Sequence, residues 1–339
     1  MPRQNTRTLC LKLLGIVLAF LSVFFLSVTF AGYASQNLYL EITTDYRPYT
    51  LAFGILDLVP VVILWRSGVW RRLTVLSLGF LSLVIVVNGW EVLPWLLAHR
   101  QPVSEAAGTK LKTIAFNIEG NNVLFEQVRN FIRGESPDVA MFCEAQTPWP
   151  SELKPLNESL PHHVRVDAMD IEIFSRHPIV HTQIFHFGPE RGFVVVGLKI
   201  ETRQLNFVAT HTYPRFWRGA EGFQLRSKTL EEGLGKQLSQ FTPPTLIMGD
   251  FNASPWSPAY KNMMRTSGYQ DGRKGFGILV TQHGHGLISR WLWRPIDHCL
   301  HSEGVRMQQI RTGPDLGSDH LPVIAELVLP PVSTRLKNP

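Results

Sequence analysis

Three long apolar runs near the amino terminus constrain this 339-residue chain most, because they favour membrane helices over a water-soluble core. The runs cover residues 9–33, 49–65 and 73–97. An α-helix that crosses a bilayer needs ~20 predominantly apolar residues. Lys12 is the only charged residue of the first run, whereas the second is short and contains Asp57 and Pro60. The pattern predicts three transmembrane helices, of which the second is the least regular.

The basic residues around these runs indicate the side of the membrane that each loop occupies, because Lys and Arg concentrate on the cytoplasmic side. They lie before or within the start of the first run and between the second and third runs, at Arg3, Arg7, Lys12, Arg66, Arg71 and Arg72. The loop 35–48 has only Arg47 against Glu41 and Asp45. We therefore expect a multi-pass protein of the inner (plasma) membrane, with its amino terminus inside and everything after Leu97 periplasmic or extracellular.

Two other topologies stay open. The first run could be a signal peptide cleaved near Gly32-Tyr33-Ala34, although its apolar stretch is longer than the usual signal core. If the run 49–65 does not cross the membrane, the topology inverts and the domain after Leu97 becomes cytoplasmic. The distribution of Lys and Arg disfavours that inversion.

The charge and cysteine content of the remaining chain speaks against a sequence-independent DNA-binding protein and against a Cys-His zinc site. From Gly108 onward there are 25 Lys and Arg against 22 Asp and Glu, without the basic tract typical of sequence-independent DNA binding. A local basic and aromatic patch, which could meet a phosphorylated substrate or anionic lipid or simply face solvent, consists of Arg215, Phe216, Trp217, Arg218, Arg226 and Lys228. The cysteines show no zinc-site spacing, and a disulfide between Cys143 and Cys299 cannot be deduced.

Polar side chains recur beside short, strand-like apolar runs of this part. Each of these residues lies at the end of such a run, shortly after it, or at or shortly before the start of the next. They are Asn117, Glu144, His211, Asp250, Asn252, Asp297, Asp319 and His320. Strand ends can hold such groups rigidly while leaving them open to a ligand. Carboxylates, amides and histidines in such places suit a hard divalent cation together with a phosphate oxyanion.

The same region reads as an α/β domain, because strand-like runs alternate with two amphipathic helices. Helical spacing covers residues 124–132, with Asn121 or Asn122 as a plausible N-cap, and residues 223–238. A stretch rich in Gly and His, Gly272 to Gly286, predicts a mobile loop. The expected divisions are a membrane region 1–100, a linker 101–112, a catalytic domain 113–330 and a tail 331–339.

The ordered set of polar groups resembles the endonuclease/exonuclease/phosphatase (DNase I-like) superfamily over roughly residues 113–329. The most specific parts are Gly-Asp-Phe-Asn at 249–252 and Ser-Asp-His at 318–320, together with the strand-terminal Glu144 upstream. The resemblance implies a two-sheet sandwich flanked by helices. It also implies a metal-dependent phosphoesterase. Bacterial members of this superfamily with an amino-terminal membrane region of this kind exist.

We expect Mg2+ (or Mn2+) to be held by oxygen ligands rather than by thiolates or several imidazoles. Glu144 is the first choice of ligand because it is a carboxylate that ends an otherwise apolar strand, and Asn117 could be its neutral neighbour. Similarity to the family adds Asp319. Asp250 fits either a general base that activates water or a second metal ligand.

The remaining candidate residues would act on the phosphate. Asn252 should lie on the same side as Asp250 if the chain stays extended, where its amide can donate to a phosphate oxygen. His320 can donate to the phosphate while Asp297 orients its ring. By resemblance, His211 assists phosphate binding or protonates the leaving group.

The sequence thus predicts a membrane-anchored, Mg2+-dependent phosphoesterase that hydrolyses phosphodiester or phosphomonoester bonds, with a nuclease as one form. Its partners would be the lipid bilayer and a phosphate-ester substrate: a nucleic acid, a nucleotide or a phospholipid. The alternatives are a sphingomyelinase-like phosphodiesterase of lipid headgroups and a catalytically inactive membrane binding protein. The complete set of polar groups favours an enzyme.

Overall fold

The computed structural model describes residues 2–34, 37–97, 108–242, 244–283 and 292–330. Most of the expected linker 101–112 and all of the expected tail 331–339 lie outside these residues. The chain forms two compact units: the first is Met1–Pro94 with Trp256–Pro258, and the second is Trp95–Pro255 with Ala259–Pro339.

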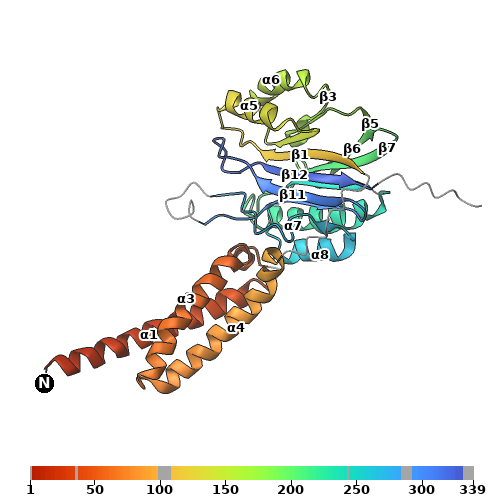
Figure 1. Ribbon diagram of the computed structural model, residues 1–339. Helices are drawn as coiled ribbons and strands as arrows, with labels where there is room; N and C mark the ends of the chain where they lie inside the picture. The colour runs from red at the N-terminus through yellow and green to blue at the C-terminus, as the bar shows by residue number, and fades with distance from the viewer. Residues whose placement is uncertain (1, 35–36, 98–107, 243, 284–291, 331–339) are drawn as a thin grey trace, which may run out of the picture. The chain divides into compact units, whose positions relative to one another are not determined.

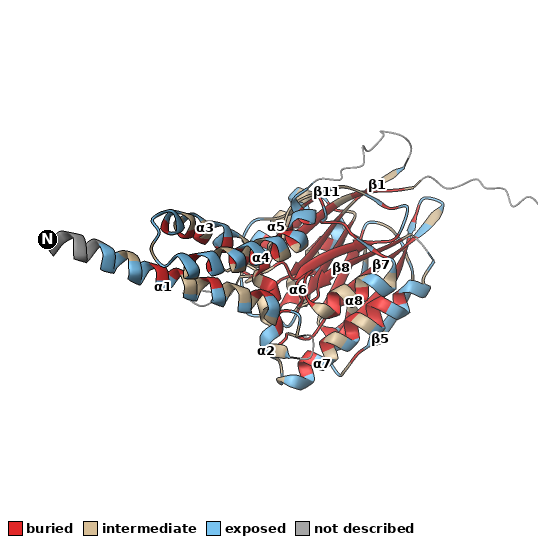
Figure 2. Cartoon of the chain, turned by 90° about the horizontal axis from the view of Figure 1, so that it is seen from below, coloured by how far each residue is buried: buried red, intermediate tan, exposed pale blue. Residues whose placement is uncertain are grey.

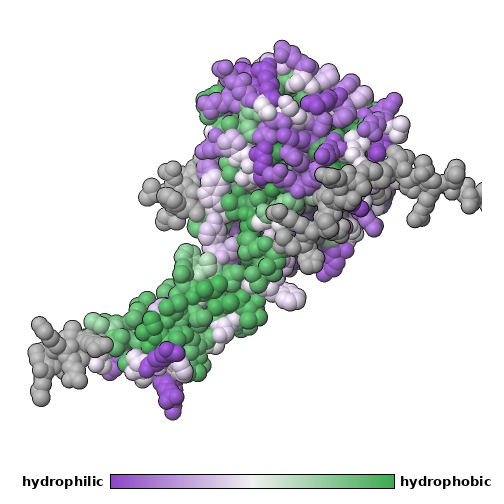
Figure 3. All heavy atoms as spheres, in the orientation of Figure 1, coloured by the Kyte–Doolittle hydropathy of each residue, from purple (hydrophilic) through white to green (hydrophobic). Residues whose placement is uncertain are grey.

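The first unit is helical. Its helices are α1 (Pro2–Ala31), α2 (Leu38–Glu41), the 3-10 helix η1 (Ile42–Tyr46), α3 (Arg47–Arg66) and α4 (Arg71–Leu96). Within the described residues, three helical stretches are long and apolar enough to cross a membrane: Thr8–Ala31, Leu38–Arg66 and Arg71–Leu96. Their apolar surface is visible in Figure 3. The three predicted helices are therefore present, and the short second run belongs to a longer helical stretch than its hydropathy indicated.

A polar contact joins the three long helices of this unit. Asn88 of α4 is fully buried, and its Nδ2 donates to Thr29 Oγ1 of α1 at 2.9 Å. Arg47 Nη1 of α3 donates to Asn88 Oδ1 at 3.2 Å. Buried polar groups are costly unless they are hydrogen-bonded, so these bonds restrict how the helices can rotate against one another.

The second unit contains two six-stranded mixed sheets (Figure 1). The first has the order β11-β12-β1-β2-β4-β3, with β1 (Thr109–Asn117), β2 (Val139–Cys143), β3 (His162–Val166), β4 (Ile171–Ser175), β11 (Arg306–Thr312) and β12 (Val323–Leu329). The second has the order β5-β6-β7-β8-β10-β9, with β5 (Ile179–His186), β6 (Gly192–Ile200), β7 (Arg203–His211), β8 (Thr245–Asp250), β9 (Gln270–Asp271) and β10 (Asp297–His301).

Each sheet has one parallel pair among its described strands, at its centre. In the first sheet β1 runs parallel to β2, and Asn117 pairs with Cys143 at their carboxyl ends. In the second sheet β7 runs parallel to β8, and His211 pairs with Asp250. Parallel neighbours end at the same edge of a sheet. Polar residues that end successive strands are thereby placed side by side.

Three apolar layers hold the two sheets and their helices together. A large cluster between the sheets contains inward-facing residues of both, such as Ala115, Met141, Ala209, Met248 and Cys299. The outer face of the first sheet packs on α5 (Phe125–Glu135) and α6 (Trp149–Leu153), and that of the second on the π-helix η4 (Thr229–Gln237) and α8 (Pro258–Ser267). The buried residues of this sandwich are red in Figure 2. The fold class expected from the sequence is confirmed.

Some local expectations were wrong. Helix α5 has Leu124 at its N-cap position, without a capping side chain, because the Asn122 carboxamide bonds to Leu124 N in the preceding turn instead. The described part of the expected mobile loop, 272–283, is held in place, since Arg273 is only 1% exposed and Gln282 pairs with Arg294. Residues 284–286 of that loop lie outside the described residues.

Gly249 offers a test of the strand register that places the polar groups. Its φ is +141°, and a Cβ at this position would lie 1.9 Å from the carbonyl oxygen of Thr210 in β7. Replacing it with alanine should separate β7 from β8 and destabilise the protein by at least about 3 kcal/mol. The thermal midpoint of the full chain in detergent should fall by roughly 6–12 °C.

The matched control is Gly134→Ala in α5, where an added Cβ meets nothing within 4 Å. Alanine is the better helix former by about 1 kcal/mol, so this variant should melt at or slightly above the midpoint of the unsubstituted chain. Equal midpoints for the Gly249→Ala and Gly134→Ala variants would contradict the close approach of β7 to β8.

Candidate active site

The candidate residues continue the inward-facing rows of the sandwich core. Side chains on one face of a strand recur every second residue. Asn117, His211 and Asp250 each come two residues after a member of the inter-sheet core, namely Ala115, Ala209 and Met248. Asp297 likewise comes two residues before Cys299, which belongs to the same core. The apolar interior of the sandwich therefore becomes polar at one edge.

Asn117 joins the carboxylates of this edge. Its Nδ2 donates to Glu144 Oε1 at 3.0 Å and to Asp250 Oδ2 at 3.1 Å. Its Oδ1 accepts from the backbone N–H of Glu119 at 3.1 Å. Asn117 is thus at the site, but its amide nitrogen faces the carboxylates. To ligate a metal as predicted, the amide would have to rotate so that Oδ1 faces the carboxylates. This rotation would break the hydrogen bond from the Glu119 N–H.

Glu144 lies just beyond β2 in a left-handed turn, with φ +56°. Non-glycine residues avoid this conformation unless the surroundings enforce it. Here the neighbouring Ala145 donates its N–H to Asp170 O at 3.0 Å and accepts from Arg165 Nη1 at 3.1 Å. The turn brings Glu144 Oε1 to 3.6 Å from His211 Nε2.

Asp250 is the most enclosed carboxylate of the site, at 1% exposure. Its Oδ1 accepts from the backbone N–H of Asn252 at 2.7 Å, and its Oδ2 accepts from Asn252 Nδ2 at 3.2 Å. Burial raises the pKa of Asp250 to about 7, and the nearby Asp297 carboxylate adds to the rise. A carboxylate with this pKa can exchange a proton near neutral pH.

Asn252 contacts Asp250, but through a turn rather than through the extended backbone that we expected. The chain does not stay extended after β8, because Asn252 has a left-handed backbone with φ +47°. Its Nδ2 donates to Thr212 O at 3.0 Å as well as to Asp250. The turn, rather than strand alternation, puts the two side chains together.

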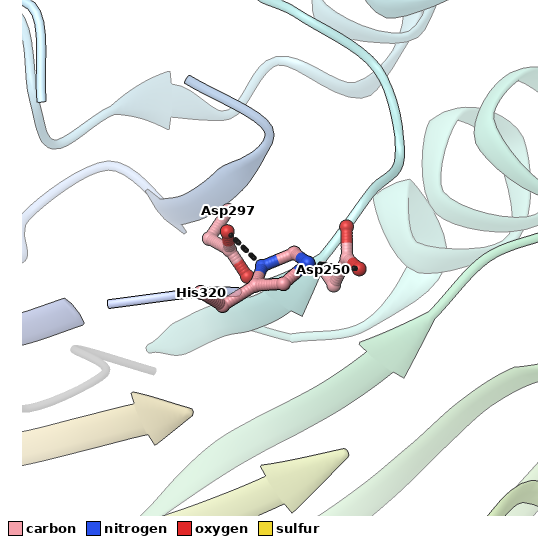
Figure 4. A group of neighbouring side chains, drawn as sticks. All are labelled: Asp250, Asp297 and His320. Atoms are coloured by element: carbon pink, nitrogen blue, oxygen red, sulfur yellow. Dashed lines mark hydrogen bonds and ion pairs between the residues drawn. The ribbon is translucent and has the colours of Figure 1, made fainter. Parts of the chain in front are cut away.

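His320 lies between two carboxylates, as Figure 4 shows. Its Nδ1 is 2.8 Å from Asp297 Oδ2, and its Nε2 is 3.7 Å from Asp250 Oδ2. Burial favours the neutral ring, but the Asp297 and Asp250 carboxylates outweigh it and raise the pKa of His320 to about 10. The ring is therefore an imidazolium at neutral pH.

His211 has the opposite electrostatic state. It is completely buried, and neither ring nitrogen has a hydrogen-bond partner among the described residues. Its Nε2 lies 3.6 Å from Glu144 and 3.8 Å from Asp250. Burial, followed by the positive charges of Arg191 and His320, lowers its pKa well below the usual range. A neutral ring can donate one hydrogen bond but is a poor proton source at neutral pH.

Asp319 approaches the same nitrogen of His320 as Asp250 does. Its Oδ1 lies 3.8 Å from His320 Nε2, and its Oδ2 accepts from Gln282 Nε2 at 2.7 Å. Its backbone N–H donates to Glu119 Oε2 at 3.0 Å. Glu119 and Gln282 were not anticipated from the sequence, although Glu119 comes only two residues after the strand-terminal Asn117.

A divalent cation fits the chemistry of this edge. The donors available are the carboxylate oxygens of Glu144, Asp250 and Asp319, which are of the kind that Mg2+ and Mn2+ take, and the Asn117 amide oxygen would join them after rotation of its amide. Nε2 of the buried His211, which has no hydrogen-bond partner among the described residues, lies 3.6 Å from Glu144 and 3.8 Å from Asp250, too far for hydrogen bonds. A phosphate oxygen or a coordinated ligand would satisfy this nitrogen. The site therefore fits a metal ion and an oxyanion together.

One close group differs from the predicted metal set. Among the described residues, Asp250, Asp297 and His320 form the one group of three or more potential His, Cys, Asp or Glu ligands whose atoms lie within 4.8 Å of one another. Glu144 and Asp319 are not in it. Since His320 Nδ1 already bonds Asp297 Oδ2 at 2.8 Å, we interpret this group as a hydrogen-bonded Asp297–His320 pair beside Asp250.

A second buried polar network, adjoining the site, was also missed from the sequence. It consists of Tyr260, Asp271, Arg273 and His298, all at most 5% exposed. Strand alternation places His298 on the opposite face of β10 from Asp297, and its ring packs against those of Phe251 and Tyr260. No spacing in the sequence reveals the network, because β9 and the turn after it bring Asp271 and Arg273 to β10 only in the folded chain.

Comparison with known proteins agrees with this architecture. The family model described as "Endonuclease/Exonuclease/phosphatase family" matches residues 114–320. No curated protein matches the sequence.

Several solved structures share the fold at low sequence identity. TDP2 of D. rerio, complexed with a single-strand DNA product, is 16% identical with a TM-score of 0.53, and the match covers 65% of this chain and 99% of that one. Sphingomyelinase C from Streptomyces griseocarneus is 17% identical with a TM-score of 0.50, covering 64% and 99%. A beta toxin variant from Staphylococcus aureus with bound magnesium ions is 16% identical with a TM-score of 0.50, also covering 64% and 99%.

At these identities the structures establish a shared fold and leave the substrate undetermined. The family model matches more than half of the chain and spans every candidate site residue from Asn117 to His320. The chain belongs to the endonuclease/exonuclease/phosphatase family.

Proposed function

We propose that this protein is a membrane-anchored, Mg2+-dependent phosphoric ester hydrolase. The observation that carries the proposal is that His320, which is hydrogen-bonded to Asp297, lies beside the buried carboxylate of Asp250 at one edge of the sandwich. An enzyme of phosphoester hydrolysis needs a base for water and positive charge for the phosphoryl oxygens. Here Asp250 would supply the base and His320 the positive charge, with Oδ2 and Nε2 3.7 Å apart. Members of the family are typically metal-dependent phosphoesterases, in agreement with this assignment.

The metal would be held by carboxylates on both sides of the site. We assign Glu144 and Asp319 as ligands, together with Asn117 as the neutral member after rotation of its amide, and Asp250 would contribute either as a further ligand or as the base. Bound there, Mg2+ or Mn2+ would neutralise charge on the phosphoryl group and on the leaving oxygen. A cation beside Asp250 would also lower the pKa of that carboxyl group from its value in the metal-free site.

The protein's own groups would handle the proton and the oxyanion. Asp250 accepts the proton of the attacking water, and the N–H groups of Asn252 help to hold Asp250 for that role. His320 Nε2–H donates to a phosphoryl oxygen while Asp297 fixes its tautomer. His211 is neutral, so we assign it to hydrogen bonding of the phosphate rather than to protonation of the leaving group.

Substitution of one ligand and of the imidazolium tests these roles. The full chain in detergent should hydrolyse bis(p-nitrophenyl) phosphate with Mg2+ or Mn2+. Hydrolysis should stop when EDTA is added. Glu144→Gln keeps the shape of the side chain but removes the charge, and His320→Ala removes the donor. Each should lower kcat/KM by roughly 100- to 10,000-fold.

The controls make the same chemical changes at exposed positions, Glu303→Gln and His186→Ala, and should keep full activity. Near-normal turnover by Glu144→Gln or His320→Ala would refute the assigned roles. Metal-independent binding of phosphate esters, with no turnover of any ester by the unsubstituted chain, would favour an inactive binding protein.

Membrane anchoring and orientation are part of the same proposal. Three apolar helical stretches support the anchoring. The excess of Arg between the second and third stretches supports a catalytic unit outside the cytoplasm, in the periplasm or the extracellular space.

Reporter fusions test this orientation. Alkaline phosphatase fused after Pro339 should be active, and a fluorescent protein that matures only in the cytoplasm should stay dark. The same reporters fused within the loop 67–70 should give the reverse pattern. A fluorescent fusion after Pro339 would mean that the stretch Leu38–Arg66 does not cross and that the catalytic unit is cytoplasmic.

A lipid-headgroup phosphodiesterase is the second candidate, favoured by the presence of three candidate membrane spans in the same chain as the site. An anchored enzyme meets bilayer lipids at high effective concentration. In lipid nanodiscs, such an enzyme should release the headgroup from sphingomyelin or phosphatidylcholine and leave a single-stranded oligonucleotide intact. Cleavage of the oligonucleotide, with no headgroup release, would instead identify a nuclease.

A further inference from the structure

Arg273 makes an unusually complete set of contacts for a residue outside the candidate active site. It is 1% exposed, and its guanidinium pairs with the Asp271 carboxylate through Nε at 3.1 Å and Nη2 at 2.8 Å. Tyr260 Oη also donates to Asp271 Oδ2. The buried positive charge is therefore compensated without any group of the active site, and the rest of the guanidinium is available for other contacts.

Those other contacts reach the backbone that carries Asp297. Arg273 Nη1 donates to the carbonyl oxygen of Asp297 at 3.0 Å and lies 3.5 Å from that of Pro295. The guanidinium thus contacts backbone carbonyls just before β10 and at its first residue. Asp297 holds the His320 ring, so the position of His320 depends on this backbone.

The same guanidinium reaches the loop after β8 through His298. Arg273 Nη2 lies 2.6 Å from His298 Nδ1, and His298 Nε2 lies 2.7 Å from the carbonyl oxygen of Ala253. A carbonyl can only accept, so Nε2 carries the proton and Nδ1 accepts from Arg273. Burial and the charge of Arg273 lower the pKa of His298 to about 4, in agreement with this neutral tautomer.

We propose that Arg273 is a positioning residue that holds the Asp297–His320 pair and the Asp250–Ala253 loop at their working separation. The inference rests on the proposed function. His320 and Asp250 belong to separate segments, with Nε2 and Oδ2 at 3.7 Å and no direct hydrogen bond between them. A displacement of about 1 Å at such a site can reduce turnover roughly 100-fold, whereas binding of the substrate is less sensitive.

The first test is Arg273→Lys, which keeps the charge beside Asp271 but cannot reach Asp271, Asp297 O and His298 at once. With bis(p-nitrophenyl) phosphate and Mn2+, the full chain carrying this substitution should lose roughly tenfold or more in kcat. KM and the Mn2+ concentration for half-maximal activity should change less than threefold. A purely structural role would lower the thermal midpoint without this separation of kcat from KM.

The matched control is Arg129→Lys in α5. Arg129 Nη1 also bonds a carboxylate and a backbone carbonyl, those of Glu152, but it lies outside the site and its neighbouring network. This variant should keep kcat and KM unchanged while showing a similar or smaller shift in thermal midpoint.

A double-mutant cycle identifies the route of the effect. If Arg273 acts through Asp297, then Arg273→Lys should cost less than threefold in a chain that already carries Asp297→Asn. Equal losses in both backgrounds would overturn the proposed route. If Arg273→Lys does not fold, the pair Asp271→Asn with Arg273→Gln removes both buried charges together and should show the same loss in kcat.

The outcomes separate this inference from the proposed function. Normal kcat in Arg273→Lys, beside a defective Asp297→Asn variant, overturns the inference and leaves the proposed function intact. Absence of metal-dependent turnover in the unsubstituted chain, on this diester and on p-nitrophenyl phosphate, overturns the proposed function and the inference with it.

Discussion

The candidate site depends on the packing of two sheets that each have a parallel pair of strands at the centre. Burial of the inward-facing apolar side chains aligns the sheets, and the parallel pairs β1–β2 and β7–β8 then end at the same edge of the sandwich. The free energy that fixes the position of Asn117, His211 and Asp250 is therefore that of the apolar rows behind them. A polar cluster of this kind could not hold itself together, because its own members are mostly costly to bury.

The charges of the site are arranged so that burial produces distinct protonation states in neighbouring groups. His320 is an imidazolium because two carboxylates face it, whereas His211 stays neutral because burial, and then the charges of Arg191 and His320, lower its pKa. Asp250 keeps a pKa close to neutrality because burial and Asp297 disfavour its charged form. Groups whose environments push their pKa values apart are typical of acid–base and electrostatic catalysis, and the proposed division of roles follows this pattern.

The neighbouring network around Arg273 shows how the fold supports that arrangement. Burying an ion pair such as Asp271–Arg273 seldom adds much stability, because desolvation offsets the attraction. What the pair provides is a rigid guanidinium with donors in fixed directions. The β8–β10 pairing already sets Asp297 opposite Asp250, and Phe251 N–H donates to Ile296 O at 3.0 Å. The donors of Arg273 add bonds at both ends of this pairing, to the carbonyl of Asp297 and, through His298, to the carbonyl of Ala253.

The amino-acid sequence by itself determined the class of fold, the strand-ending polar residues and the three apolar helices, because hydropathy period and length are local properties. It could not determine the left-handed turns at Glu144 and Asn252, nor the bond from Asn122 that leaves α5 without a capping side chain. Each depends on a contact with a distant segment: Ala145, next to Glu144, bonds Asp170, Asn252 bonds Thr212, and Asn122 Nδ2 donates to Leu316 O. Tertiary structure alone decided that Asn117 presents its nitrogen to the carboxylates and that Arg273 reaches β10, because both depend on side chains brought together across long stretches of chain.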